Sequence, residues 1–107
     1  MINVEIVRDS LGKIASFTVE NHGQTLVCAA VSMLVLNTIN SIEKLTDDDF
    51  TCEINNRQSA TFSLTNPESR SSGIEILIDA MFIGLSCAKA EHPDEIEITE
   101  VNHGNHD

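Results

Sequence analysis

Two long segments with the apolar spacing of helices, 26–42 and 74–88, constrain the fold of this chain more than any other feature. The first is apolar on nearly all sides at its start, which is typical of a helix buried on several sides. The second carries a single apolar stripe, formed by Ile74, Leu77, Ile78, Met81, Leu85 and Ala88. Thr25 is expected to be the N-cap of the first helix, and Ser72 has capping-box spacing to Glu75 at the start of the second.

Short segments of alternating apolar and polar residues surround the two helices, and such alternation is typical of strands. They lie at 2–7, 15–19, 50–54, 60–64 and 96–99. Turn-forming residues separate the first segment from the second and the third from the fourth, so each pair is predicted to form a hairpin. The order β-β-α-β-β-α-β predicts an α+β fold, a two-layer domain in which two helices pack on a β-sheet.

The length of 107 residues suits one compact domain. We expect a single domain over residues 1–101 and a flexible polar tail over 102–107. The tail holds His103 and His106, and Asp47-Asp48-Asp49 forms part of an acidic loop between predicted elements. Neither pattern has the ligand spacing of a metal site, so we expect no metal and no cofactor.

The chain is strongly acidic, with 17 Asp and Glu against 6 Lys and Arg and a net charge of −11. Because nucleic-acid binding depends on neutralising phosphates with cations, this charge argues against direct binding of nucleic acid, and it also argues against an anionic membrane surface. A basic protein or peptide partner is favoured instead. The charge alone leaves open the alternative that acidity only keeps the protein soluble.

The cysteine pattern indicates a reducing compartment. Cys28, Cys52 and Cys87 are odd in number and form no close pairing motif, which argues against a disulfide framework. The N-terminal residues lack the pattern of a signal peptide, and the longest largely apolar stretch has 11 residues, too few for a membrane span. We therefore expect a cytoplasmic protein, with Cys52 and Cys87 as packing residues.

The candidate site lies where the first helix begins. His22 precedes this helix in a polar segment, and Cys28 falls in its first turn, three residues after Thr25. Thiols at helix N-termini have lowered pKa values, and the thiolate is the nucleophile of cysteine hydrolases. First-turn amides also suit a developing oxyanion. The alternative is that Cys28 is simply a small core residue of an apolar helix.

This segment resembles the ribosomal-processing cysteine protease family, Prp. The matching residues are His22 and then Leu26-Val27-Cys28-Ala29-Ala30-Val31-Ser32 at the helix start. Downstream, Asn40-Ser41-Ile42-Glu43-Lys44-Leu45 and Ala80-Met81-Phe82-Ile83-Gly84-Leu85 look like the end of the family's first helix and the core of its second. The resemblance covers roughly Met1 to Glu100.

The resemblance implies a cytoplasmic, homodimeric cysteine endopeptidase. Such an enzyme removes the N-terminal extension of ribosomal large-subunit protein L-twenty-seven through an acyl-enzyme intermediate, so the expected partner is a basic ribosomal protein precursor. Cys28 would be the nucleophile and His22 the general base. Ser32 matches the family's serine, and Ser32 and Thr25 are expected to support the site. The alternative for Ser32 is a hydrogen bond back to a carbonyl oxygen of its own helix.

The chain departs from the family pattern at the site itself. Asn21 stands where the family has Gly, Gly23 where Ala is usual, and Thr25 where the family has Asp. The segment between His22 and Cys28 is also shorter than the family norm. These departures motivate an alternative function, a non-catalytic dimeric binding protein of the same fold that recognises a basic ribosomal partner. In a third hypothesis, the apolar first helix serves only as a dimer interface.

Overall fold

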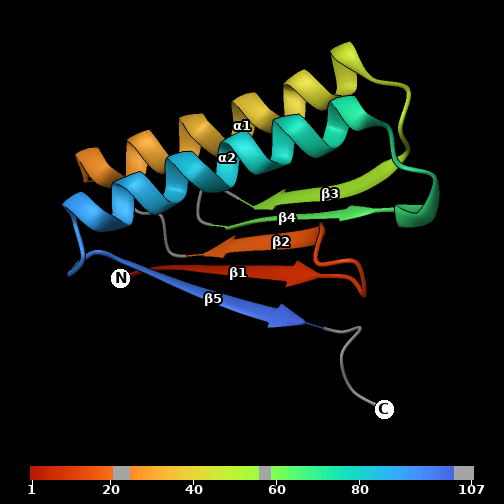
Figure 1. Ribbon diagram of the computed structural model, residues 1–107. Helices are drawn as coiled ribbons and strands as arrows, with labels where there is room; N and C mark the ends of the chain where they lie inside the picture. The colour runs from red at the N-terminus through yellow and green to blue at the C-terminus, as the bar shows by residue number, and fades with distance from the viewer. Residues whose placement is uncertain (21–24, 56–58, 103–107) are drawn as a thin grey trace.

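The computed structural model describes residues 1–20, 25–55 and 59–102. These residues form five strands, two α-helices and one short 3-10 helix in the predicted order (Figure 1). The elements are β1 (Ile2–Arg8), β2 (Ile14–Glu20), α1 (Leu26–Leu45), β3 (Phe50–Asn55), β4 (Ser59–Leu64), η1 (Pro67–Ser69), α2 (Ser72–Glu91) and β5 (Ile96–Asn102). The prediction of an α+β fold with two helices on one sheet is confirmed.

The strands form one mixed sheet with the order β3-β4-β2-β1-β5. Both predicted hairpins are present, because β1 pairs with β2 and β3 with β4 in antiparallel fashion. The β2 and β4 strands join the two hairpins, also antiparallel. The last strand, β5, returns beside β1 and runs parallel to it. Both helices lie on the same face of this sheet, and they run antiparallel to each other (Figure 1).

The core lies between the helices and the sheet. Alternation along the strands directs apolar side chains toward the helices, as in β1, where Ile2, Val4 and Ile6 are all buried. In the middle of the sheet, the Phe17 and Phe62 rings stack with their centroids 4.9 Å apart. Burial of these apolar side chains is the main stabilising contribution to a domain of this size.

The helices approach each other closely at Gly84 of α2. A Cβ atom added there would lie only 2.7 Å from Cδ2 of Leu34 in α1. Because real Cβ atoms do not approach other atoms so closely, the missing side chain of Gly84 is what leaves room for Leu34.

Both helices are longer than predicted, because α1 extends to Leu45 rather than ending at residue 42 and α2 spans 20 residues around the predicted 74–88. By length and composition alone α1 could cross a membrane, but a buried core helix passes the same test. Its buried residues belong to the apolar core beneath the helical layer. The predicted cap of α2 was placed one residue too late, because Ser71 rather than Ser72 accepts the N–H of Ile74.

The prediction that Cys52 and Cys87 are packing residues is wrong. Both side chains are exposed. Cys52 lies on a strand, as predicted, but that strand is β3, at the edge of the sheet. Cys87 lies on α2 outside the set of buried residues of that helix. In the predicted tail, Asn102 still belongs to β5, and His103 and His106 lie outside the described residues.

Candidate active site

Cys28 lies in the first turn of α1, on the side of the helix that faces the core. Only 6% of the residue is exposed. The predicted N-cap is confirmed, because the Thr25 side chain accepts the backbone N–H of Cys28 at 3.1 Å. The backbone of Thr25 is extended, as is usual for an N-cap residue.

The Thr25 hydroxyl makes a second contact with the same residue. It donates a hydrogen bond to Sγ of Cys28 across 3.1 Å. One side chain therefore caps the helix and also supplies a donor to the thiol. Negative charge on sulfur is stabilised by such a donor, and it is further favoured by the positive end of the helix dipole. The first turn of α1 contains no acidic residue that would oppose this effect.

Ser32 follows Cys28 by one helical turn and is partly buried. Residues at positions i and i+4 of a helix share one side, so Ser32 and Cys28 face a similar direction. Of the predicted site, the structure therefore shows Thr25 and Cys28 in contact, and helical spacing puts Ser32 on the same side of α1. His22, the predicted general base, lies outside the described residues.

Three chain segments meet at the end of the molecule that carries Cys28. The first turn of α1, the last turn of α2 and the end of β2 all lie there (Figure 1). His92, the cap residue of α2, is thus placed at this end, and its Nδ1 lies 3.6 Å from a carboxylate oxygen of Glu95. The sequence-based prediction did not include His92 among the site residues. Its position directly after a predicted helix end was the signal that could have marked it.

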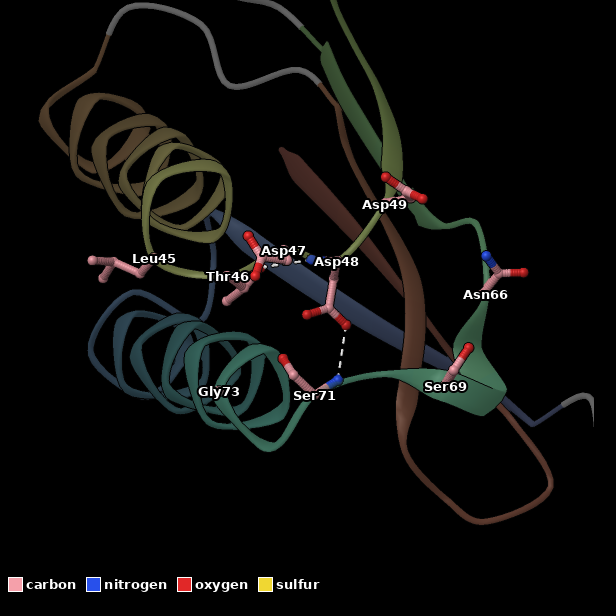
Figure 2. A pocket seen from close by; sticks show the side chains of 9 residues that line it. All are labelled: Leu45, Thr46, Asp47, Asp48, Asp49, Asn66, Ser69, Ser71 and Gly73. Carbon is pink, nitrogen blue, oxygen red and sulfur yellow. Dashed lines mark hydrogen bonds between the residues drawn. The ribbon is translucent and has the colours of Figure 1, made fainter.

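Two cavities lie at the opposite end of the helical layer. One of about 520 Å³ lies where α1 ends and α2 begins (Figure 2). Its wall includes Asp48, whose carboxylate accepts the backbone N–H of Ser71 at 2.8 Å. Burial alone raises the pKa of Asp48, but hydrogen bonds from Ser71 and Thr46 outweigh burial and hold it below its ordinary value of 3.8.

Asp48 of the acidic loop therefore holds the start of α2 through its hydrogen bond with Ser71. Within residues 1–20, 25–55 and 59–102, no group of three His, Cys, Asp or Glu side chains is arranged to hold a metal ion. The second cavity, of about 580 Å³, lies beside Arg70. The Arg70 guanidinium pairs with Asp9 and donates to the carbonyl oxygens of Ile14 and Pro67, so it joins the first hairpin to the start of α2.

Comparisons with known proteins bear on the whole chain. The family model described as cysteine protease Prp matches residues 1–97. A search of curated protein sequences finds no match. Among solved structures, the chain is similar to SMU.848 from Streptococcus mutans, with 22% identity, a TM-score of 0.85 and 96% of each chain covered.

A second similar structure is described as an essential ribosomal processing protease Prp from S. aureus in complex with a substrate peptide. It shares 17% identity with this chain at a TM-score of 0.85, over 94% of this chain and 99% of the other. At these identities the structures show that the fold is shared. The relationship to the family rests on the family model.

Proposed function

The chain belongs to the cysteine protease Prp family, and from that membership we propose that it is an active cysteine endopeptidase with Cys28 as its nucleophile. The observation that carries this proposal is the hydrogen bond from the Thr25 hydroxyl to Sγ of Cys28 at the start of α1. A thiol of the core alone needs no such donor. A sulfur that carries negative charge during catalysis is stabilised by one.

In the proposed reaction, the Cys28 thiolate attacks the carbonyl carbon of the scissile peptide bond. His22 takes the thiol proton and later gives it to the leaving amine. The substrate's N-terminal part then remains on Cys28 as a thioester until water, deprotonated by the same imidazole, releases it as a carboxylate. The oxyanion would be stabilised by amides at the start of α1 other than those of Cys28 and Ala29, which already donate to Thr25.

Thr25 and Ser32 are the supporting residues of the proposed site. The Thr25 hydroxyl, at the position where the family has Asp, is proposed to orient the Cys28 sulfur through its hydrogen bond. Unlike a carboxylate, it adds no negative charge that would oppose the thiolate. Ser32 is proposed to contribute to the same side of the helix, one turn farther along.

The proposed substrate is a basic ribosomal protein precursor, L-twenty-seven, which is cut within its N-terminal extension. Two observations support this substrate class. The similar S. aureus structure is described as a ribosomal processing protease with a substrate peptide. The charge of −11 on this chain is complementary to a basic protein, and complementary charge increases the rate of association.

We also propose that the protein is a cytoplasmic homodimer. All three cysteines are free, which suits a reducing compartment. The outward side of the helical layer exposes large apolar side chains, with Met33 of α1 at 68% exposure and Ile76 and Ile83 of α2 at 68% and 63%. An apolar surface of this kind is suited to contact with the same surface of a second copy about a two-fold axis.

A non-catalytic binding protein of the same fold is the second candidate. It is favoured by the burial of Cys28 and by the uncharged Thr25 at the position of the family's Asp. Such a protein would hold the basic precursor without cutting it, and added salt would weaken the complex.

A cleavage assay distinguishes the two functions. The protein and its Cys28→Ala variant are each incubated with L-twenty-seven precursor, and the products are identified by mass spectrometry. A single cut in the extension, made by the parent protein only, supports the endopeptidase. Retention of an uncut precursor by both proteins supports the binding function. A cut made equally by both proteins contradicts the role of Cys28.

A further inference from the structure

The face of the sheet opposite the helices carries no helix of the described chain (Figure 1). The pairing register fixes which side chains point to it. On β1, the buried Ile2, Val4 and Ile6 face the helices, so Glu5 between them faces away. Glu5 is paired with Thr18, Thr18 with Thr61 and Thr61 with Glu53. One polar row therefore crosses the open face from β1 to β3.

This open face carries negative charge that the described chain does not neutralise. Glu5, Glu20, Glu53 and Glu97 are exposed and occupy open-face positions of their strands. No described lysine or arginine occupies such a position. Most of the described cations are used elsewhere, in the pairs Arg8 with Glu100, Lys13 with Glu75 and Arg70 with Asp9, and in the bond from Lys89 to the carbonyl of Ile96.

The same face is hollowed in two places that share Thr18. A hollow of about 400 Å³ extends from Thr18 toward β3 and includes Glu53 in its lining. A second hollow, of about 300 Å³, extends from Thr18 toward β1 and includes Glu5 and Glu20. Together they form a shallow trough with carboxylates at both ends. We name it the acidic trough.

The spacing of these carboxylates suits an extended basic peptide. Three strand-to-strand steps separate Glu5 from Glu53, which is about 14 Å. Side chains four residues apart in an extended chain are separated by nearly the same distance. Lysines or arginines at such a spacing could contact both ends of the acidic trough at once. The negative charge excludes a nucleic acid or an anionic lipid as the occupant.

We propose that the acidic trough docks a lysine- and arginine-rich segment of the protein substrate, outside the segment that is cut at Cys28. The position of the trough supports this role. Glu20 is the last residue of β2, and β2 ends at the same end of the molecule as the first turn of α1 (Figure 1). A single substrate chain can therefore reach both sites. This proposal rests on the proposed function. It adds, to the contact at Cys28, a second contact with the substrate that favours a basic protein.

The test removes the charges of the acidic trough while the proposed catalytic residues stay intact. The variant combines Glu5→Gln, Glu20→Gln and Glu53→Gln. Its matched control combines Glu43→Gln, Glu68→Gln and Asp79→Asn, which changes the net charge equally at exposed positions outside the sheet. Thermal unfolding confirms that both variants are folded. Each protein is then assayed with the basic precursor and with a short peptide that contains the cut site but no lysine or arginine.

If the acidic trough docks the precursor, the triple glutamine variant should raise KM for the precursor about tenfold at low salt and leave kcat unchanged. The short peptide and the control variant should show no such change. Equal effects of the two variants would overturn the proposal, because net charge alone would then explain them. An unchanged KM for the precursor would overturn it as well.

Failure of the proposed protease function remains distinguishable from failure of the docking proposal. If the parent protein cuts neither substrate, calorimetry measures binding of the precursor to the parent and to both variants. About tenfold weaker binding by the trough variant alone supports docking without catalysis. Equal binding by all three proteins contradicts the acidic trough regardless of catalysis.

Discussion

The hydroxyl of Thr25 caps helix α1 and donates a hydrogen bond to Sγ of Cys28, with both contacts spanning 3.1 Å. Helix capping and thiol stabilisation are therefore properties of a single side chain. An uncharged side chain makes both contacts, and the first turn of α1 contains no acidic residue. Mutation can separate two effects, because the accepted N–H bears on helix stability and the donated O–H bears on the proposed catalysis.

Replacement of Thr25 by valine should impair both properties. Loss of the cap should lower the free energy of unfolding by about 1 kcal/mol. Loss of a hydrogen bond to a charged sulfur should lower kcat/KM for peptide cleavage by about tenfold or more. Thermal unfolding and steady-state cleavage measure the two effects separately.

Thr25→Ser is the matched control for this experiment. It keeps the hydroxyl, so kcat/KM should stay within about threefold of the parent value. The free energy of unfolding should stay within about 0.5 kcal/mol of the parent value. The rate of alkylation of Cys28 at pH 7 should follow the same order, because the Thr25→Val variant should react more slowly than Thr25→Ser and the parent protein. A valine variant that is less stable but cleaves at the parent rate would assign Thr25 a capping role only.

The general base is tested with two histidine variants. His22→Ala should lower kcat/KM by about 100-fold or more, because positioned bases contribute at least that much. His92→Ala removes an exposed imidazole at the end of the molecule that carries Cys28 and should change kcat/KM by less than about twofold. The opposite result, with activity lost in His92→Ala and kept in His22→Ala, would place the base at the end of α2.

Gly84 is predicted to be required for the packing of Leu34. A methyl group at position 84 would lie 2.7 Å from Cδ2 of Leu34 and 3.2 Å from its Cδ1. Overpacking of this kind should outweigh the better helix propensity of alanine, so Gly84→Ala should destabilise the protein by about 1 kcal/mol. Chemical denaturation measures this difference.

The sign of the Gly84 effect should reverse when Leu34 is shortened. In a Leu34→Ala background the obstructing atoms are absent, and Gly84→Ala should then stabilise the fold by about 0.5 kcal/mol through helix propensity. If Gly84→Ala is equally destabilising in both backgrounds, the close approach of the two helices at this point is not the cause.

Asp48 should make stability depend on pH in the acid range. Because its pKa is lower in the folded protein than its ordinary value of 3.8, its carboxylate stabilises the fold above that value. This contribution is lost as the pH falls below 3.8 and through the lower folded pKa. Asp48→Asn should therefore cost about 1 kcal/mol at pH 7, and the difference from the parent should vanish in strong acid.

Asp47→Asn provides the control for the Asp48 experiment. It removes the same charge from an exposed neighbour and so accounts for relief of repulsion within this acidic chain. Unfolding free energies of all three proteins are compared between pH 7 and pH 2. A constant difference between parent and Asp48→Asn across this range would contradict the role of the Asp48 carboxylate in binding Ser71.

Local patterns were sufficient to predict the elements, because alternation and helical spacing report the side of an element that is buried. The same patterns do not determine the order of the strands. The pairing of β4 with β2 and the return of β5 beside β1 depend on contacts between segments far apart in sequence. The exposure of Cys52 follows from that order, because β3 is at an edge of the sheet.

Of the proposed site, the cap of Cys28 by Thr25 was predictable from the sequence. Thr25 and Cys28 are three residues apart at a helix start, and an N-cap bond at that spacing is expected from the sequence. The donation to sulfur depends on the side-chain rotamers of both residues, which spacing does not specify. The bond between Asp48 and Ser71 joins residues 23 positions apart, so it arises only after α1 and α2 are packed together.

The most direct test of the account is detection of the covalent intermediate on Cys28. The protein is mixed with excess precursor and quenched in acid within the first turnover, and the adduct is located by peptide mapping in a mass spectrometer. The account predicts a thioester between Cys28 and the carbonyl of the released N-terminal extension, which is absent in Cys28→Ala. Cleavage of the precursor without an adduct on Cys28, or with the adduct on Cys52 or Cys87, would contradict it.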